Sequence, residues 1–208
     1  MNRRNPHASR SRGFTLIEIL VAVTILIILA VAAYGGLNAL IKAREITQEH
    51  DRHFQQLQLA MATITRDLRQ ASTRPVRLTS GVLVPAMMGG ANNIPALAFT
   101  RAGRPNPLLL SRSGLQRVGY TVEDGKLERI SFDVLDRAIA PTPQRQTLLD
   151  GVQAISLAFM DAQHQSRTHW PPLNSEPGTF LSRNPIAVKI TLDTKRWGEI
   201  NRLVLLAQ

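Results

Sequence analysis

The residue whose surroundings make the strongest chemical demand is Glu18, a carboxylate inside an otherwise apolar segment. The run from Ile19 to Ala33 contains one polar residue, Thr24. A carboxylate in apolar surroundings costs free energy unless it meets a cation, so an acidic residue within a membrane-length helix indicates a functional role. Glu18 is therefore the first candidate for a functional residue, and its chemistry would be charge pairing.

A second candidate cluster holds two histidines beside two carboxylates. His50 and His53 lie three residues apart next to Glu49 and Asp51. A protein metal site requires further ligands that converge from other segments, so a solvated helix surface is the favoured interpretation. The chain has no cysteine and lacks the Gly-x-Ser-x-Gly, Gly-x-Gly-x-x-Gly and P-loop motifs. We therefore expect no enzymatic activity, no cofactor and no metal.

A third candidate feature is the excess of basic residues. The 208-residue chain has a formal net charge of +10. Four arginines and no acid lie in residues 1–13, and seven arginines and no acid lie in residues 68–122. Unopposed arginines can neutralise nucleic-acid phosphates, yet the second stretch offers only Phe99 and Tyr120 for base stacking. A DNA-contacting surface and ion pairing with protein acids are both open, and ion pairing is favoured.

The element that positions Glu18 is a helix long enough to cross a membrane. Residues 14–36 number 23 and would form about 34 Å of helix, against a hydrocarbon thickness of about 30 Å. Arginines before the segment and the acids Glu45, Glu49 and Asp51 after it place residues 1–13 in the cytoplasm. A secretory signal peptide or a plain signal anchor would show the same basic and apolar pattern, but neither gains anything from Glu18.

The helix is predicted to continue beyond the apolar segment, because no proline occurs between Pro6 and Pro75. An apolar stripe at helical spacing could face a partner helix or the protein's own sheet, and its short length favours the sheet. The residue before a proline is pushed out of helical geometry, so the helix should end at about residue 72. The stripe consists of Phe54, Leu57, Met61, Ile64 and Leu68.

Beyond the helix, the pattern changes to short runs that are typical of strands. Residues 187–192 alternate as a half-buried strand should, and Glu123-Asp124-Gly125-Lys126 carries the Asp-Gly signature of a hairpin turn. Segments rich in Gly, Pro and Asn are predicted as loops at 85–95, 101–107 and 166–184. A long helix followed by antiparallel strands is an α+β arrangement. The predicted strands are 82–84, 96–100, 115–122, 127–135, 147–149, 155–160, 186–192 and 200–206.

The order Gly13-Phe14-Thr15-Leu16-Ile17-Glu18 before an apolar helix resembles the processing site of type IV prepilins and type II secretion pseudopilins. The resemblance implies that an aspartyl prepilin peptidase cuts between Gly13 and Phe14 and methylates the new amino terminus on Phe14. Glu18 then matches the glutamate at the fifth mature position of that family. Its cation would be the Phe14 ammonium of a neighbouring subunit in a helical filament.

The soluble part resembles the J-type minor pseudopilins of type II secretion over nearly its whole length. The resemblance implies a pilin-like fold, in which the long helix packs on an antiparallel β-sheet domain. It rests on motifs that come in family order: Arg66-Asp67-Leu68, Arg74-Pro75-Val76-Arg77, Phe99-Thr100-Arg101-Ala102-Gly103, Asn106-Pro107, Leu115-Gln116-Arg117-Val118, Val134-Leu135-Asp136-Arg137-Ala138, Leu149-Asp150-Gly151-Val152, Trp170-Pro171, Pro185-Ile186-Ala187-Val188 and Trp197-Gly198-Glu199-Ile200.

The same resemblance implies a structural role without catalysis. J-type subunits sit near the tip of a periplasmic pseudopilus with I-type and K-type minor pseudopilins, and this complex is expected to initiate assembly of the major pseudopilin and to aid export of folded proteins across the outer membrane. The prepilin peptidase, the inner-membrane secretion platform and secreted proteins are the further expected partners, whereas nucleic acid is not. The alternative is a type IV pilus or DNA-uptake (competence) minor pilin with a basic DNA-contacting surface.

The expected domain organisation follows from these assignments. Residues 1–13 form a cytoplasmic leader, 14–36 the transmembrane half of the helix, 37–72 its periplasmic half, and 73–208 the β-rich globular domain. The protein should cross the inner membrane once, with its amino terminus in the cytoplasm and its globular domain in the periplasm. The candidate partner-contacting residues are Phe54, Leu57, Met61, Arg74, Arg77, Arg101 and Arg104.

Overall fold

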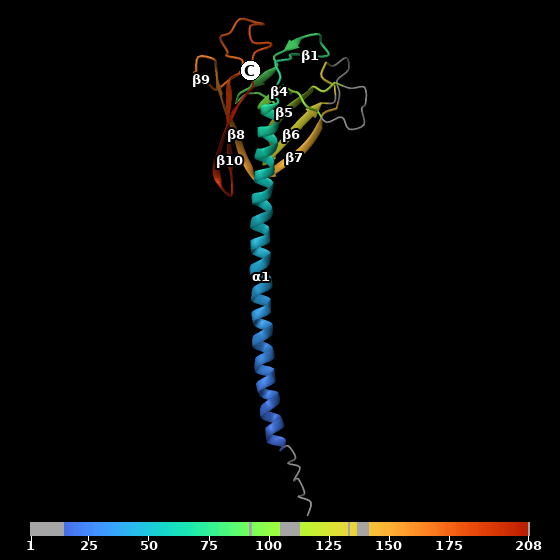
Figure 1. The fold of residues 1–208 in the computed structure, drawn as a ribbon, viewed down its shortest axis with the longest axis vertical. Helices are drawn as coiled ribbons and strands as arrows, with labels where there is room; N and C mark the ends of the chain where they lie inside the picture. Colours follow the sequence, from blue (N-terminus) through green and yellow to red (C-terminus); the bar gives the residue numbers. More distant parts are fainter. Residues whose placement is uncertain (1–14, 92, 105–112, 133, 137–141, 208) are drawn as a thin grey trace, which may run out of the picture. The chain divides into compact units, whose positions relative to one another are not determined.

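A computed structural model describes residues 15–91, 93–104, 113–132, 134–136 and 142–207 (Figure 1). The chain divides into two compact units, Met1–Arg52 and His53–Gln208, and each is considered by itself. Gly13 and Phe14 lie outside the described residues, as do the side chains of Glu49 and His50.

The helix α1 (Leu16–Arg69) begins directly after Thr15. The N–H of Glu18 donates to the Thr15 carbonyl at 3.1 Å and to its hydroxyl at 3.4 Å, which is the geometry of a helix N-cap. Within Leu16–Glu45, the most apolar window of 18 residues has a mean hydropathy of 3.0, and none of it is buried. By length and composition this part can cross a membrane, as the sequence predicts.

The helix ends at Arg69 because the next residues bond to a strand, β4 (Leu97–Arg101). The N–H of Ser72 donates to the carbonyl of Thr100 at 2.8 Å, and the N–H of Ala102 donates to the carbonyl of Gln70 at 2.8 Å. The chain is therefore drawn into the sheet before it reaches Pro75, slightly earlier than the proline alone would require.

The strands of the second unit form two larger sheets and a small hairpin (Figure 1). The five-stranded sheet has the order β3-β4-β5-β6-β7, with β3 (Met87–Gly89), β5 (Gln116–Glu123), β6 (Lys126–Phe132) and β7 (Gln144–Asp150). The four-stranded sheet has the order β11-β10-β8-β9, with β8 (Val152–Met160), β9 (Ser166–Arg167), β10 (Ala187–Thr194) and β11 (Gly198–Leu205). The hairpin pairs β1 (Val76–Arg77) with β2 (Leu83–Val84), and all pairings are antiparallel.

The core of this unit forms where both sheets meet the last turns of α1. Ile64 and Leu68 from the helix join Phe99 and Tyr120 from the five-stranded sheet, whose rings stack with centroids 6.3 Å apart. The alternating residues Val188, Ile190 and Leu192 of β10 enter the same cluster and are fully buried. The alternation in the sequence thus predicts the buried face of β10 correctly.

The α+β, pilin-like class predicted from the sequence is confirmed, and each predicted strand overlaps an observed one. Asp124 and Gly125 both have positive φ, 51° and 72°, as an Asp-Gly hairpin turn between β5 and β6 requires. The predicted loops at 85–95 and 166–184 were wrong in part, because they contain the short strands β3 and β9. These strands are held by pairing with β4 and β8 rather than by a strand pattern of their own.

Candidate functional site

Glu18 lies in the first turn of α1, where an acidic side chain also complements the helix dipole. Its side chain is exposed, and within the described part of the chain no side chain pairs with it. Gly13 and Phe14, the predicted processing residues, lie outside the described residues.

The apolar stripe on α1 packs on the protein's own sheets, which is the interpretation that the sequence favoured. Leu57, Met61, Ile64 and Leu68 are all buried in the core cluster. Phe54 differs, because 51% of its surface is exposed. Of the three stripe residues named as candidate contacts, only Phe54 therefore offers a large surface to a partner.

Asp67 is a buried carboxylate that lies in the last turns of α1 and is 1% exposed. Its Oδ1 accepts a hydrogen bond from Nη1 of Arg101 on β4. Its Oδ2 accepts from the hydroxyl of Tyr120 on β5 at 2.7 Å and from Nε of Arg129 on β6 at 2.6 Å. One carboxylate thus joins the helix to three successive strands.

We call Asp67, Gln70, Arg101, Tyr120 and Arg129 the Asp67 cluster. The remaining donors of Arg101 are also used, since its Nη2 bonds to Oε1 of Gln70 at 2.7 Å and to the carbonyl of Gly103 at 3.1 Å. Burial raises the pKa of the Tyr120 hydroxyl, and the adjacent Asp67 carboxylate raises it further, so the tyrosine stays protonated and donates. Charges taken out of water are tolerated only when paired and bonded in this way.

The sequence motifs included Asp67 and Arg101 but did not reveal that they bond to each other. A signal for Asp67 existed, because it follows Ile64 by three residues and precedes Leu68, on the stripe that faces the sheets. An acid on a buried helix face requires a cation from elsewhere. The sequence did not identify which arginines would supply it, and it gave no role to Arg129.

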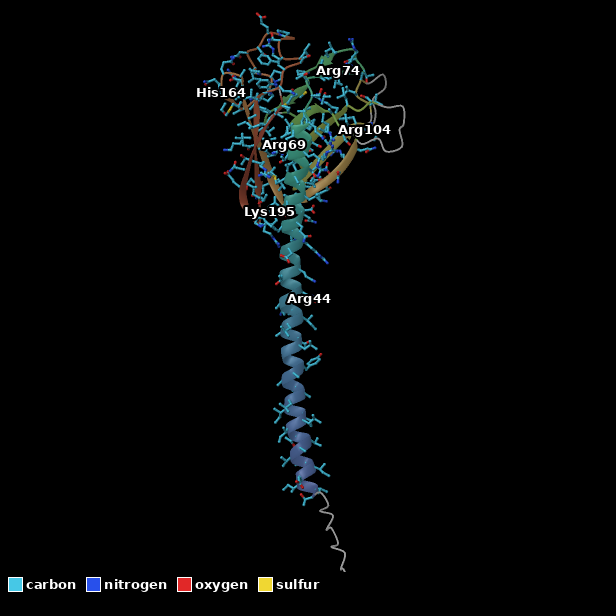
Figure 2. The ribbon with its side chains drawn as sticks, in the orientation of Figure 1. Arg44, Arg69, Arg74, Arg104, His164 and Lys195 are labelled. Atoms are coloured by element: carbon cyan, nitrogen blue, oxygen red, sulfur yellow. The ribbon has the colours of Figure 1, made fainter. Side chains whose placement is uncertain are left out.

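Arg74 and Arg77 of the acid-free stretch also make hydrogen bonds within the domain. Arg74 Nη2 donates to Oδ2 of Asp136 at 2.7 Å, and the backbone N–H of Arg77 donates to Oδ1 of the same carboxylate at 3.0 Å. The Arg77 N–H is the main reason that the pKa of Asp136 is lowered, and Arg74 adds to the effect. Figure 2 shows Arg74 at the β1 end of the domain and Arg104 beside the five-stranded sheet.

Arg117 on β5 is buried and donates from Nη1 to the carbonyls of Pro85 at 2.9 Å and Ala86 at 2.7 Å. Arg101 and Arg117 therefore place part of the positive charge inside the domain, where it is bonded to other groups of the same chain. Internal ion pairing, which the sequence analysis preferred over phosphate contacts, is confirmed for Arg74 and Arg101. Arg104 is half-buried, and its N–H donates to the carbonyl of Gly114 at 3.0 Å.

Among the side chains that the structure describes, no group of three or more His, Asp or Glu residues converges. The side chains of Glu49 and His50 lie outside this set. His53 lines a hollow of about 180 Å³ together with Asp150, Lys195 and Trp197. Lys195 lies at the base of the second unit in Figure 2, in the turn between β10 and β11.

Comparison with known proteins gives two family matches that together cover most of the chain. A family described as type II secretion system (T2SS), protein J matches residues 35–206, and a prokaryotic N-terminal methylation motif matches residues 8–34. The second match contains Gly13, Phe14 and Glu18. The methylation motif and the apolar helix together fit a single-pass, membrane-anchored pseudopilin.

Individual relatives agree with these families. Type II secretion system protein J of Escherichia coli is 36% identical over 93% of this chain and 95% of its own length. Type II secretion system protein J of Klebsiella pneumoniae is 32% identical over 95% of this chain and 96% of its own length. The solved GspK-GspI-GspJ complex of the type 2 secretion system of enterotoxigenic E. coli contains a chain that matches with a TM-score of 0.65 at 34% identity, over 75% of this chain and 98% of that one.

These matches favour a secretion pseudopilin over the DNA-uptake alternative, and the matched family is one of structural pseudopilins. The long apolar helix, the antiparallel sheets and the two consecutive family matches all agree. The chain therefore belongs to the J family of type II secretion system proteins, the J-type minor pseudopilins.

Proposed function

We propose that this chain is a subunit of the tip complex of a periplasmic pseudopilus, where it assembles with I-type and K-type minor pseudopilins. In this role it helps to initiate assembly of the major pseudopilin and to export folded proteins across the outer membrane. The observation that carries the proposal is the likeness to a chain of the solved GspK-GspI-GspJ complex, at 34% identity over 98% of that chain. The function is mechanical, and the chain itself catalyses no reaction.

The proposal includes a defined processing and membrane topology. Residues 1–13 form a cytoplasmic leader that a prepilin peptidase removes between Gly13 and Phe14, and Phe14 then carries the methylated amino terminus. Residues 14–36 cross the inner membrane, residues 37–72 continue the helix into the periplasm, and residues 73–208 form the periplasmic domain. The match of the methylation motif to residues 8–34 and the apolar character of Leu16–Glu45 support this arrangement.

Glu18 has a specific part in this scheme. Its carboxylate is exposed at the start of an apolar helix and has no partner within the described residues. In hydrocarbon such a charge is costly unless it is neutralised. The amino terminus on Phe14 of a neighbouring subunit is a suitable cation, and their pairing would set the axial stagger between subunits.

The Asp67 cluster supports a mechanical role within the second unit. A subunit that is pushed or pulled through its helix must transmit the force to its globular part. Asp67 on α1 and Gln70 just after its end are bonded to Arg101, Tyr120 and Arg129 on three strands. Because Asp67 and Arg101 are buried and paired, the end of the helix cannot separate from the sheet without exposing paired charges.

The experiment that tests the proposal is co-purification of the full chain with the I-type and K-type pseudopilins of the same genome, co-expressed and extracted in detergent. We expect the three to elute together and to give one complex mass. Binding to duplex DNA is measured in parallel over a range of salt concentrations, because phosphate binding weakens steeply with salt. A chain that bound DNA in this salt-dependent way and ignored both pseudopilins would overturn the proposal.

A further inference from the structure

The four-stranded sheet has one long edge that the described residues leave open, and this edge is β11. Its neighbour on one side is β10, with which it pairs over Gly198–Leu205 without a register shift, and no described strand lies on its other side. In an antiparallel sheet alternate residues of an edge strand direct their N–H and C=O groups outward. β11 therefore presents a row of backbone donors and acceptors that another strand could bond.

The last three residues of β11 lack the features that usually protect an edge. Proteins protect sheet edges with charged side chains, proline, bulges or short strands. β11 has no proline, no lysine and no bulge against β10, and its two charged residues, Glu199 and Arg202, come before its last three residues. Instead, Leu203 and Leu205 project from the face opposite the core and are 58% and 71% exposed. A long, regular edge with exposed leucines indicates a surface that is covered in the functional state.

The other edges of the two sheets differ from β11. β3 and β9, with three and two residues, are too short to accept a long strand. β7 is longer, but its first half is polar. Its residue Arg145 is paired with Glu123 and Glu128 of the same sheet. The open, apolar character is thus specific to β11 among the described edges.

The open edge continues into the exposed part of α1. A groove of about 380 Å³ runs between Leu57, Gln58, Met61 and Ala62 on the helix and Ile200, Asn201 and Arg202 on β11. Phe54 precedes Gln58 by four residues and so lies on the same helix face, with half of its surface exposed. A segment added to β11 would therefore also lie against Phe54, the stripe residue whose side chain is exposed.

We propose that β11 is a strand-acceptor edge, and that its occupant is an extended segment of a neighbouring pseudopilin that adds to the four-stranded sheet. The backbone groups of β11 require a β-strand, and Leu203 and Leu205 require apolar side chains at alternate positions on one face of it. This inference rests on the proposed function, since it takes the occupant from the tip complex. A second copy of this chain or a secreted protein would be a different occupant, and the test separates them.

The test uses the full chain in the co-purified complex with I-type and K-type pseudopilins. The variant is Leu203→Lys with Leu205→Lys, which places the natural edge-protecting residue at two exposed positions. The matched control is Val82→Lys with Leu173→Lys, two apolar residues that are 57% and 79% exposed elsewhere on the unit. We expect the β11 variant to bind its partner about tenfold more weakly and the control to bind like the wild type.

Amide hydrogen exchange distinguishes strand addition from contact through side chains alone, because it measures the protection of the β11 backbone amides. We expect alternate amides between residues 198 and 205 to gain protection when the complex forms, because only strand addition bonds the outward N–H groups. Since the chain has no native cysteine, a single cysteine at Asn201 or Leu203 allows a cross-link whose mass identifies the occupant. The expected mass is that of an I-type or K-type subunit.

The possible outcomes separate this inference from the proposed function. If the complex forms but the β11 variant binds like the control and the β11 amides stay unprotected, the strand-acceptor edge is refuted and the tip-complex role stands. If no complex forms with either pseudopilin, the proposed function fails and the inference fails with it. A cross-link to a second copy or to a secreted protein overturns the chosen occupant.

Discussion

Replacing Asp67 with alanine should cause a large loss of stability in the second unit. Its side chain is 2% exposed, and it pairs with Arg101 and Arg129, whose side chains are 9% and 13% exposed. Removing one partner of a buried ion pair costs about 3–5 kcal/mol, because the remaining charge stays buried without compensation. The Tyr120 hydroxyl also loses its acceptor, worth about 1–3 kcal/mol by itself.

These two costs share one carboxylate and do not add, so we expect the Asp67→Ala change to lower the free energy of unfolding by about 4 kcal/mol. For a unit of this size, the midpoint of thermal unfolding falls by about 2–4 °C for each kcal/mol. The expected shift is therefore roughly 8–16 °C. An effect of this size is well outside the range of an ordinary surface substitution.

The measurement is urea or thermal unfolding of the full chain in detergent, followed by tryptophan fluorescence. Both tryptophans, Trp170 and Trp197, lie in the second unit, and Trp170 is 3% exposed in its core. The matched control is Asp136→Ala, because the Asp136 carboxylate also pairs with an arginine but is 44% exposed. Exposed pairs contribute about 0–1 kcal/mol, so the control should change little.

Two results would refute the reasoning about the Asp67 cluster. The first is a loss of stability for Asp67→Ala no larger than that for Asp136→Ala. The second concerns a double variant that adds Arg129→Met to Asp67→Ala. Because it removes one of the two uncompensated guanidinium groups, we expect it to recover part of the lost stability, and further destabilisation would show that the charge is not the cause.

Three further predictions concern Gly13, Glu18 and Asp161. Gly13→Leu should leave the leader attached, because a bulky residue blocks the cleavage site; mass spectrometry of the membrane-extracted chain checks this, and a mass equal to that of the processed wild type would contradict it. Glu18→Leu should be cleaved normally yet enter the complex poorly, and normal incorporation and secretion would remove the argument for charge pairing. Asp161 accepts the N–H of Gln165 at 2.8 Å and Nε of Arg167 at 2.8 Å, and its pKa is lowered chiefly by that N–H and further by Arg167. The pKa of this carboxyl in the unfolded chain is higher, about 3.9. The stabilisation is therefore present above about pH 4 and is lost as the pH falls through the folded pKa. Urea unfolding between about pH 6 and 3 should show that the free energy of unfolding falls less steeply with pH for Asp161→Asn than for the wild type, and equal slopes would count against this prediction.

Local pattern was sufficient to predict several elements of this protein. The apolar segment, the helical stripe and the Asp124-Gly125 turn each depend on neighbouring residues, because helix periodicity and turn conformation are set within a few positions. The start of β7 at Gln144 and the strands β3 and β9 were not predicted. Their residues carry no clear strand pattern, and they are strands only because β6, β4 and β8 pair with them.

The sequence by itself determined the family, the membrane-length helix, the predicted processing residues and the unusual position of Glu18. Only the tertiary structure decided which arginines pair with Asp67, because Arg101 and Arg129 lie 34 and 62 residues from it along the chain. It also decided that Leu57 and Met61 are core residues and that β11 is an open edge. The physical reason is that burial and strand order result from contacts between segments far apart in the sequence, whereas periodicity and linear motifs are local.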